Sequence, residues 1–148
     1  MQTANDLISE KKFIAELQKH WLGQICKSGE FDHFDYTLVN NEGQTIFVLE
    51  LRARTKSMQY FANHNYMVST YKISRVKQAA EIRNAKPIFG VQANDGQFLL
   101  NLNIAPNEIA DMQVPDRNPV HGNHEMTIQS MNFYTPSRYL PLSWVANV

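Results

Sequence analysis

Two neighbouring strand patterns joined by a short polar turn constrain the fold of this chain most strongly. The first pattern covers residues 31–39, the second covers residues 45–54, and Asn-Asn-Glu-Gly lies between them at 40–43. A cluster of this kind favours a tight turn, so the sequence predicts a β-hairpin. Because side chains alternate along a strand, Glu50 and Arg52 should share one face, while Phe47, Leu49 and Leu51 face the other way.

A carboxylate in the middle of so apolar a strand is costly unless it is paired or binds a metal ion. Glu50 is therefore a candidate functional residue. If the hairpin closes Val39 against Gln44, Asp35 lies opposite Val48 and is a diagonal neighbour of Glu50 on the same face. At such a separation, roughly 7–8 Å between Cα atoms, both carboxylates can reach one shared divalent ion.

Length and composition favour a single globular domain. The chain has 148 residues, of which 43% are hydrophobic and 19% charged. No apolar run is long enough to span a bilayer, and the N-terminal residues do not resemble a secretory signal, which predicts a cytoplasmic protein of a cell or of a virus inside it. The single cysteine, Cys26, excludes an internal disulfide framework and a cysteine zinc cluster.

The formal net charge of zero conceals a strongly basic segment. Residues 51–86 contain eight basic residues and one acidic residue, so this segment carries +7 and the remainder carries −7. A local patch of this kind can dock a phosphate backbone without making the whole protein basic. A solvated helix face beside a loop would have the same composition, so charge alone leaves both interpretations open.

Periodicity and turn residues predict an α/β sandwich, with a sheet packed against helices. One helix is expected from about Ser9 to Ile25, with Ser9 as its N-cap; if it contributes an acid to a site, its phase favours Glu10. A second helix is expected from Thr70 to about Ala85, with Ser69 as N-cap. Further strands are expected at 87–91, after the turn at 94–96, and within 126–134.

The order and spacing of these features resemble the PD-(D/E)XK nuclease-like, or restriction-endonuclease-like, superfamily. Its core runs helix, β-hairpin, helix, strand, with an acid on one hairpin strand and an acid-x-lysine motif on the next. Asp35 matches the first acid, and Glu50-Leu51-Arg52 matches the second motif. Small phage-encoded members are the most similar, on the segments 34–36, 50–54 and 66–72. The resemblance covers a core of about 9–103 within a single domain 1–148, and leaves 104–148 as a C-terminal extension.

This resemblance implies a restriction-endonuclease-like fold with a central mixed β-sheet flanked by helices, and a magnesium-dependent nuclease. Asp35, Glu50 and the backbone carbonyl of Leu51 would hold Mg²⁺ or Mn²⁺. Arg52 stands where the family usually has lysine. Arginine can stabilise charge on the attacked phosphate, but it does not deprotonate and cannot serve as a general base.

The basic residues near this motif are candidates for contacts with DNA. They are Arg54, Lys56, Lys72 and Arg75. Lys72 lies in the first turn of its expected helix, where a bound phosphate would meet both the lysine and backbone N–H groups. An ordinary surface lysine is the alternative. The same lysine completes a Ser-x-x-Lys pattern with Ser69, but a helix cap explains Ser69 without a serine hydrolase.

The sequence therefore predicts a phage-encoded Mg²⁺-dependent DNA endonuclease that hydrolyses phosphodiester bonds. A homodimer would suit cleavage of both strands. One alternative is a catalytically inactive protein of the same fold that binds nucleic acid or a host protein, for example as a defence inhibitor. Another is a structural α/β protein in which Glu50 forms a buried ion pair with Arg52 or Arg54.

Overall fold

The computed structural model describes residues 4–29, 32–54, 57, 66–115 and 126–147. Within these ranges no helix has both the length and the hydrophobicity needed to cross a membrane. The predicted contacts of Lys56 lie outside the described residues.

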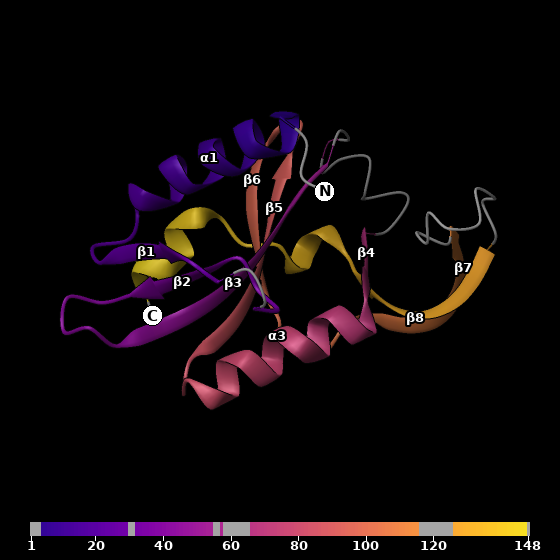
Figure 1. Cartoon of the computed structure of the whole chain (residues 1–148). Coiled ribbons are helices and arrows are strands. Elements are labelled where there is room, and N and C mark those ends of the chain that lie inside the picture. Colours follow the sequence, from indigo (N-terminus) through magenta and orange to yellow (C-terminus); the bar gives the residue numbers. More distant parts are fainter. Residues whose placement is uncertain (1–3, 30–31, 55–56, 58–65, 116–125, 148) are drawn as a thin grey trace.

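A five-stranded mixed sheet forms the centre of the molecule (Figure 1). In spatial order its strands are β1 (Gln24–Lys27), β2 (Tyr36–Val39), β3 (Thr45–Ala53), β5 (Lys86–Ala93) and β6 (Gly96–Asn101). The β3–β5 pair is parallel, and the other pairs are antiparallel. Helices α1 (Ala4–Gln18) and α3 (Thr70–Ile82) flank the sheet. The predicted α/β class, with a central mixed sheet flanked by helices, is confirmed.

A second, three-stranded sheet lies to one side of this body (Figure 1). Its strands, in spatial order, are β4 (Tyr66–Ser69), β8 (Met126–Tyr134) and β7 (Glu108–Pro115). The described chain ends in two short 3-10 helices, η2 (Pro136–Arg138) and η3 (Leu142–Asn147). The sequence predicts β8 but not β7, a strand in which the apolar side chains of Ile109 and Met112 are exposed.

Each face of the main sheet has its own hydrophobic core. The α1 face buries, among others, Phe13, Leu17, Phe47, Leu49 and Leu51. The α3 face buries, among others, Val48, Ile73, Val76, Phe89 and Val91. Alternation along β3 therefore separates the leucines beside Glu50 from the face that Glu50 shares with Val48, as the sequence predicts.

The hairpin register differs from the one expected. Val39 pairs with Thr45, the pairing is irregular between Leu38 and Val39, and Thr37 rather than Asp35 lies opposite Val48. The cause is a longer turn. Asn40 Oδ1 accepts hydrogen bonds from the N–H groups of Glu42 and Gln44, at 3.0 and 2.9 Å. The assumed closure of Val39 against Gln44 was therefore wrong, and the actual register moves Asp35 further along β3, toward Glu50.

The first helix ends earlier than expected. It runs from Ala4 to Gln18, so Ser9 lies inside it and Ile25 belongs to β1, a strand that the sequence analysis did not predict. The turn after the helix is held by the Trp21 indole N–H, which donates to the Val39 carbonyl at 3.0 Å. Ile25 continues the helical spacing of the apolar residues only by coincidence, since the chain has already turned into a strand that pairs with β2.

The second helix begins as predicted and ends three residues early. Ser69 is its N-cap, and its Oγ accepts a hydrogen bond from the Lys72 N–H at 3.4 Å. Asn84 adopts a left-handed conformation with φ of 52°, which ends the helix at Ile82. The Ala85 N–H then donates to the Ala80 carbonyl at 2.8 Å, which satisfies one of the last helical carbonyls.

Gly90 allows α1 to approach β5 closely. A Cβ atom at this position would lie 2.7 Å from Phe13 Cζ and 3.1 Å from a methyl carbon of each of Leu49 and Leu51. We expect Gly90→Ala to lower the free energy of unfolding by about 1–3 kcal/mol, because this part of the core has no room to relax. Urea denaturation measures the change. An unchanged midpoint would contradict the close packing of α1 on β5.

Candidate active site

Glu50 is a buried acidic residue at the centre of the main sheet. It lies on β3, in register with Phe89 of β5, and its side chain is 2% exposed. Glu50 Oε1 lies 2.7 Å from Arg52 Nη1 and 3.5 Å from Lys72 Nζ. The strand thus supplies the acid and one cation, and the first turn of α3 supplies the second cation.

Asp35 is fixed against the same strand. Its Oδ2 accepts a hydrogen bond from the Leu51 N–H at 2.8 Å, and its own N–H donates to the Leu49 carbonyl at 2.9 Å. On the other side, the Ser28 N–H donates to the Asp35 carbonyl at 2.9 Å. The backbone and the carboxylate of Asp35 are therefore held on either side of Glu50.

The pKa of Glu50 depends on burial and on three charged neighbours, Asp35, Arg52 and Lys72. The pKa of Glu50 is raised from 4.5 to about 7, first by burial of the carboxyl group and second by the negative charge of Asp35. Arg52 and Lys72 act in the opposite direction. Two cations therefore only partly offset the cost of ionising Glu50 in this position, and a further positive charge would stabilise the ionised form.

Lys72 contacts the acid rather than standing alone at the surface. The sequence predicts a phosphate contact at the start of α3, and the structure adds a partner, because Lys72 Nζ lies 3.5 Å from Glu50 Oε1. The Ser69 cap fixes the first turn from which this side chain extends. The sequence could not show this contact, because β3 and α3 are separated by sixteen residues, 54–69, whose path it does not define.

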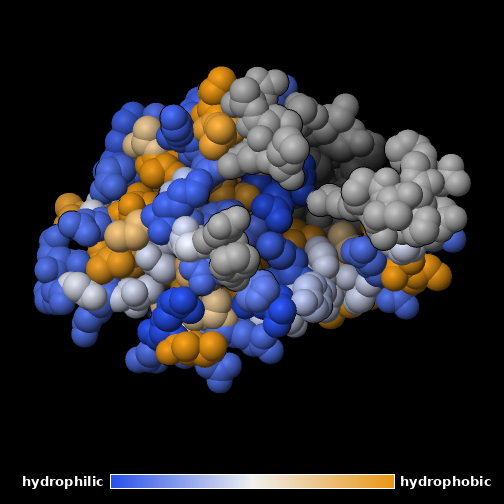
Figure 2. All heavy atoms as spheres, in the orientation of Figure 1, coloured by the Kyte–Doolittle hydropathy of each residue, from blue (hydrophilic) through white to orange (hydrophobic). Residues whose placement is uncertain are grey.

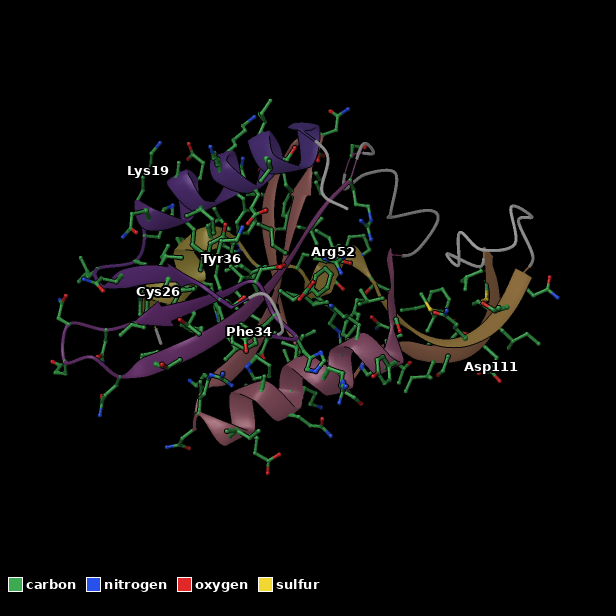
Figure 3. The ribbon with its side chains drawn as sticks, viewed as in Figure 1. Lys19, Cys26, Phe34, Tyr36, Arg52 and Asp111 are labelled. Atoms are coloured by element: carbon green, nitrogen blue, oxygen red, sulfur yellow. The ribbon has the colours of Figure 1, made fainter. Side chains whose placement is uncertain are left out.

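The other predicted DNA contacts that the structure describes are Arg54 and Arg75. Arg54 is exposed, and its Nη1 donates to the Ala53 carbonyl at 3.0 Å. The Arg75 guanidinium lies 5.2 Å from the centre of the exposed Tyr71 ring. Arg75 Nε is buried and has no hydrogen-bond partner within the described part of the chain. Figure 3 labels Arg52 near the middle of the view, with Lys19 and Asp111 toward opposite ends of the molecule.

Glu10, the favoured acid of the first helix, contacts Tyr36 and Lys27. Its Oε1 accepts a hydrogen bond from the Tyr36 hydroxyl and lies 3.0 Å from Lys27 Nζ. Tyr36 belongs to the core on the α1 face, whereas the Glu50 side chain lies on the α3 face. Burial raises the pKa of the Tyr36 hydroxyl, and the hydrogen bond and charge of Glu10 and the charge of Asp35 raise it further, so Tyr36 is influenced by both acids.

Two residues that hold the Asp35 segment were missed by the sequence analysis. Ser28 Oγ donates to the Phe34 carbonyl, and the Arg83 guanidinium lies 4.7 Å from the centre of the Phe34 ring. The spacing of Lys72, Arg75 and Arg83 on one side of a helix could have suggested Arg83. Ser28 follows the unpredicted strand β1, so no sequence signal pointed to it.

A comparison with models of protein families shows which family the chain belongs to. A model of the family described as "Phage putative PDDEXK endonuclease" matches residues 1–125. The chain belongs to this family. No curated protein and no solved structure matches it. The phage PD-(D/E)XK resemblance predicted from Asp35 and the Glu50-Leu51-Arg52 motif is thereby confirmed.

The donor set of this PD-(D/E)XK chain suits a hard divalent cation. Asp35 and Glu50 offer carboxylate oxygens and Leu51 offers a carbonyl oxygen, which are ligand types that Mg²⁺ and Mn²⁺ prefer. No cluster of three or more His, Cys, Asp or Glu side chains occurs within the described ranges. Mg²⁺ is commonly held by one or two carboxylates with water and phosphate, so a carboxylate pair is sufficient. The residues present therefore fit the metal.

Proposed function

We propose that the protein is a Mg²⁺-dependent DNA endonuclease of phage origin that hydrolyses phosphodiester bonds and acts in the host cytoplasm. The observation that carries this proposal is the buried Glu50, whose pKa of about 7 reflects burial and the neighbouring Asp35. A strongly shifted carboxylate beside two cations is typical of a functional site. Membership of a phage endonuclease family supports the same activity.

The roles of the residues follow from their contacts. Asp35, Glu50 and the Leu51 carbonyl would hold Mg²⁺, with Mn²⁺ as a substitute. The bound ion would lower the pKa of a water molecule and stabilise charge on the attacked phosphate. Arg52 stabilises that phosphate as a fixed cation, because a guanidinium does not give up its proton. Lys72 reaches the same acid from α3 and, unlike Arg52, has a side chain that can exchange a proton.

DNA would lie along the basic segment beside the acid. Arg54, Lys56, Lys72 and Arg75 would position its phosphate backbone. Figure 2 shows hydrophilic residues over the middle of the visible face, in the region of α3 and the end of β3. Because phosphate contacts release counterions, DNA affinity should fall steeply as the salt concentration rises. A homodimer would provide one such site for each strand of a duplex.

Incubation with a panel of purified DNAs tests the activity. We expect cleavage with Mg²⁺ or Mn²⁺ and none after EDTA treatment. Asp35→Asn should lower the cleavage rate roughly 100-fold or more, because it removes a metal ligand while keeping the shape of the side chain. Asp32→Asn is the matched control, since Asp32 is exposed and accepts its hydrogen bond from the Gly29 N–H at 2.7 Å. Equal loss in both variants, or activity that survives Asp35→Asn, would reject the assignment of Asp35.

One contact favours a second candidate function, a catalytically inactive protein of this fold that binds nucleic acid or a host protein. Arg52 forms with Glu50 the ion pair expected of a site that needs no metal. Calorimetry with Mn²⁺ in the presence of DNA distinguishes the two. If the protein binds DNA or a host protein but neither binds Mn²⁺ nor cleaves DNA, the second candidate function is correct. Nicking activity that appears only in Arg52→Lys would then identify a lapsed enzyme.

A further inference from the structure

One nitrogen of Arg52 bonds to two of the three oxygen donors of the candidate metal site. Arg52 Nη1 lies 2.7 Å from Glu50 Oε1 and donates to the Leu51 carbonyl at 3.1 Å. The side chain turns back on its own strand to make both contacts. The third donor, Asp35, has one oxygen engaged by the Leu51 N–H. The guanidinium thus binds the same oxygens that a divalent cation would need.

The charges of the cluster also oppose metal binding in the free protein. When Glu50 is ionised, Asp35 and Glu50 carry two formal negative charges and Arg52 and Lys72 carry two positive charges, so the cluster is balanced without a metal ion. A divalent cation would bring two further charges into a site where Glu50 is 2% exposed. With Arg52 and Lys72 in place, such an ion would give the cluster a net positive charge beside two cations that already contact Glu50. A metal ion is therefore expected to bind well only if Arg52 leaves or an anion arrives.

A phosphodiester provides such an anion. The Arg52 side chain is 38% exposed, so its guanidinium can reach solvent while Glu50 stays buried. A guanidinium forms paired hydrogen bonds with phosphate oxygens and binds them strongly. A phosphate that takes up the guanidinium would free Glu50 Oε1 and the Leu51 carbonyl and would also add negative charge beside the site.

We propose that Arg52 couples metal binding to nucleic-acid binding, by occupying the metal ligands in the free protein and moving to a phosphate in the complex. This inference rests on the proposed function, since it concerns the same site. By thermodynamic linkage the effect is reciprocal, so DNA raises the affinity for the metal and the metal raises the affinity for DNA. The free protein would accordingly be a weak metal binder, which would keep the nuclease inactive away from its substrate.

Calorimetric titration of Mn²⁺ into the free protein tests the first half of the proposal. We expect Arg52→Met to bind Mn²⁺ at least about 5-fold more tightly than the wild type, because the competing cation is gone. Arg138→Met is the matched control, since Arg138 also donates to a backbone carbonyl, that of Ala105, at 3.3 Å, and should leave Mn²⁺ affinity unchanged. Equal affinity in the wild type and Arg52→Met would overturn the proposal. Arg52→Gln, which keeps a hydrogen-bonding side chain, should tighten binding in the same direction if Arg52→Met does not fold.

The same titration with a short phosphorothioate DNA duplex tests the coupling, after subtraction of Mn²⁺ binding to DNA alone. The duplex should tighten Mn²⁺ binding about 5-fold or more in the wild type and much less in Arg52→Met. An equal gain in both proteins would overturn the role of Arg52 but not the proposed function. Absence of Mn²⁺ binding in every variant, with and without DNA, would reject the metal-dependent nuclease and this inference with it.

Discussion

Glu50→Gln is expected to raise the free energy of unfolding by up to about 3 kcal/mol at pH 8. The pKa of Glu50 rises from 4.5 in the unfolded chain to about 7 in the folded protein. That difference of about 2.5 pH units corresponds to the stated free energy. The buried carboxylate must ionise above pH 7 in the folded state, and glutamine has no charge to bury.

The sign of this effect defines the pH window. Between pH 4.5 and 7 the folded protein holds a proton on Glu50 that the unfolded chain has lost. The contribution of Glu50 to stability is therefore full below pH 4.5, falls as the pH rises and is lost above about 7. Thermal unfolding of the wild type and Glu50→Gln should give curves that separate progressively from pH 5 to 8.

Glu16→Gln is the matched control for this prediction. Glu16 pairs with Lys19 at 3.0 Å on the surface of α1, and both side chains are well exposed. Its removal should change the free energy of unfolding by less than about 1 kcal/mol. A difference between wild type and Glu50→Gln that stays constant from pH 5 to 8 would contradict the shifted pKa of Glu50.

A destabilising residue at the centre of a sheet calls for a reason beyond folding. The Glu50–Arg52 pair could belong to a purely structural protein, but replacing a buried ion pair with apolar residues is often neutral or stabilising. Functional sites are where proteins accept such costs. Glu50→Gln should therefore give a more stable protein that has lost Mn²⁺ binding. If Glu50 had only a structural role, its replacement would not both remove Mn²⁺ binding and increase stability.

The sequence predicted the elements that local patterns define. Alternation along β3 set the two faces of the sheet, Ser69 marked the start of α3, and the turn at 94–96 marked the hairpin between β5 and β6. Each of these signals depends on neighbours within a few residues. The same local signals placed Asp35, Glu50 and Arg52 on one hairpin, in which Asp35 directly precedes β2 and the other two residues lie on β3.

The sequence failed where geometry depends on contacts between distant segments. The register of β2 against β3 depends on how Asn40 holds its turn, and β1 exists because it pairs with β2. The contact of Lys72 with Glu50 joins a helix and a strand separated by residues without a clear pattern. No local rule could show that Arg52 turns back to the Leu51 carbonyl, because that contact depends on the burial of Glu50.

Lys72→Met is expected to lower the rate of the chemical step roughly 100- to 1,000-fold, with a much smaller effect on KM. Lys72 Nζ lies 3.5 Å from Glu50 Oε1, so it can act on the attacked phosphate or on the water beside the carboxylates. Arg52 cannot replace it in a step that transfers a proton. Single-turnover cleavage of a labelled duplex separates this step from DNA binding.

Lys77→Met provides the control, because Lys77 is exposed on the same helix. It should retain the wild-type rate, and Mn²⁺ affinity should not be weakened in either variant, since neither lysine is an oxygen ligand. Lys72→Arg then identifies the role of the lysine. Recovery of most of the rate would show that a fixed positive charge is sufficient, whereas a rate as low as that of Lys72→Met would show that a proton must be exchanged. A wild-type rate in Lys72→Met would mean that Lys72 serves only to balance the charge of Glu50.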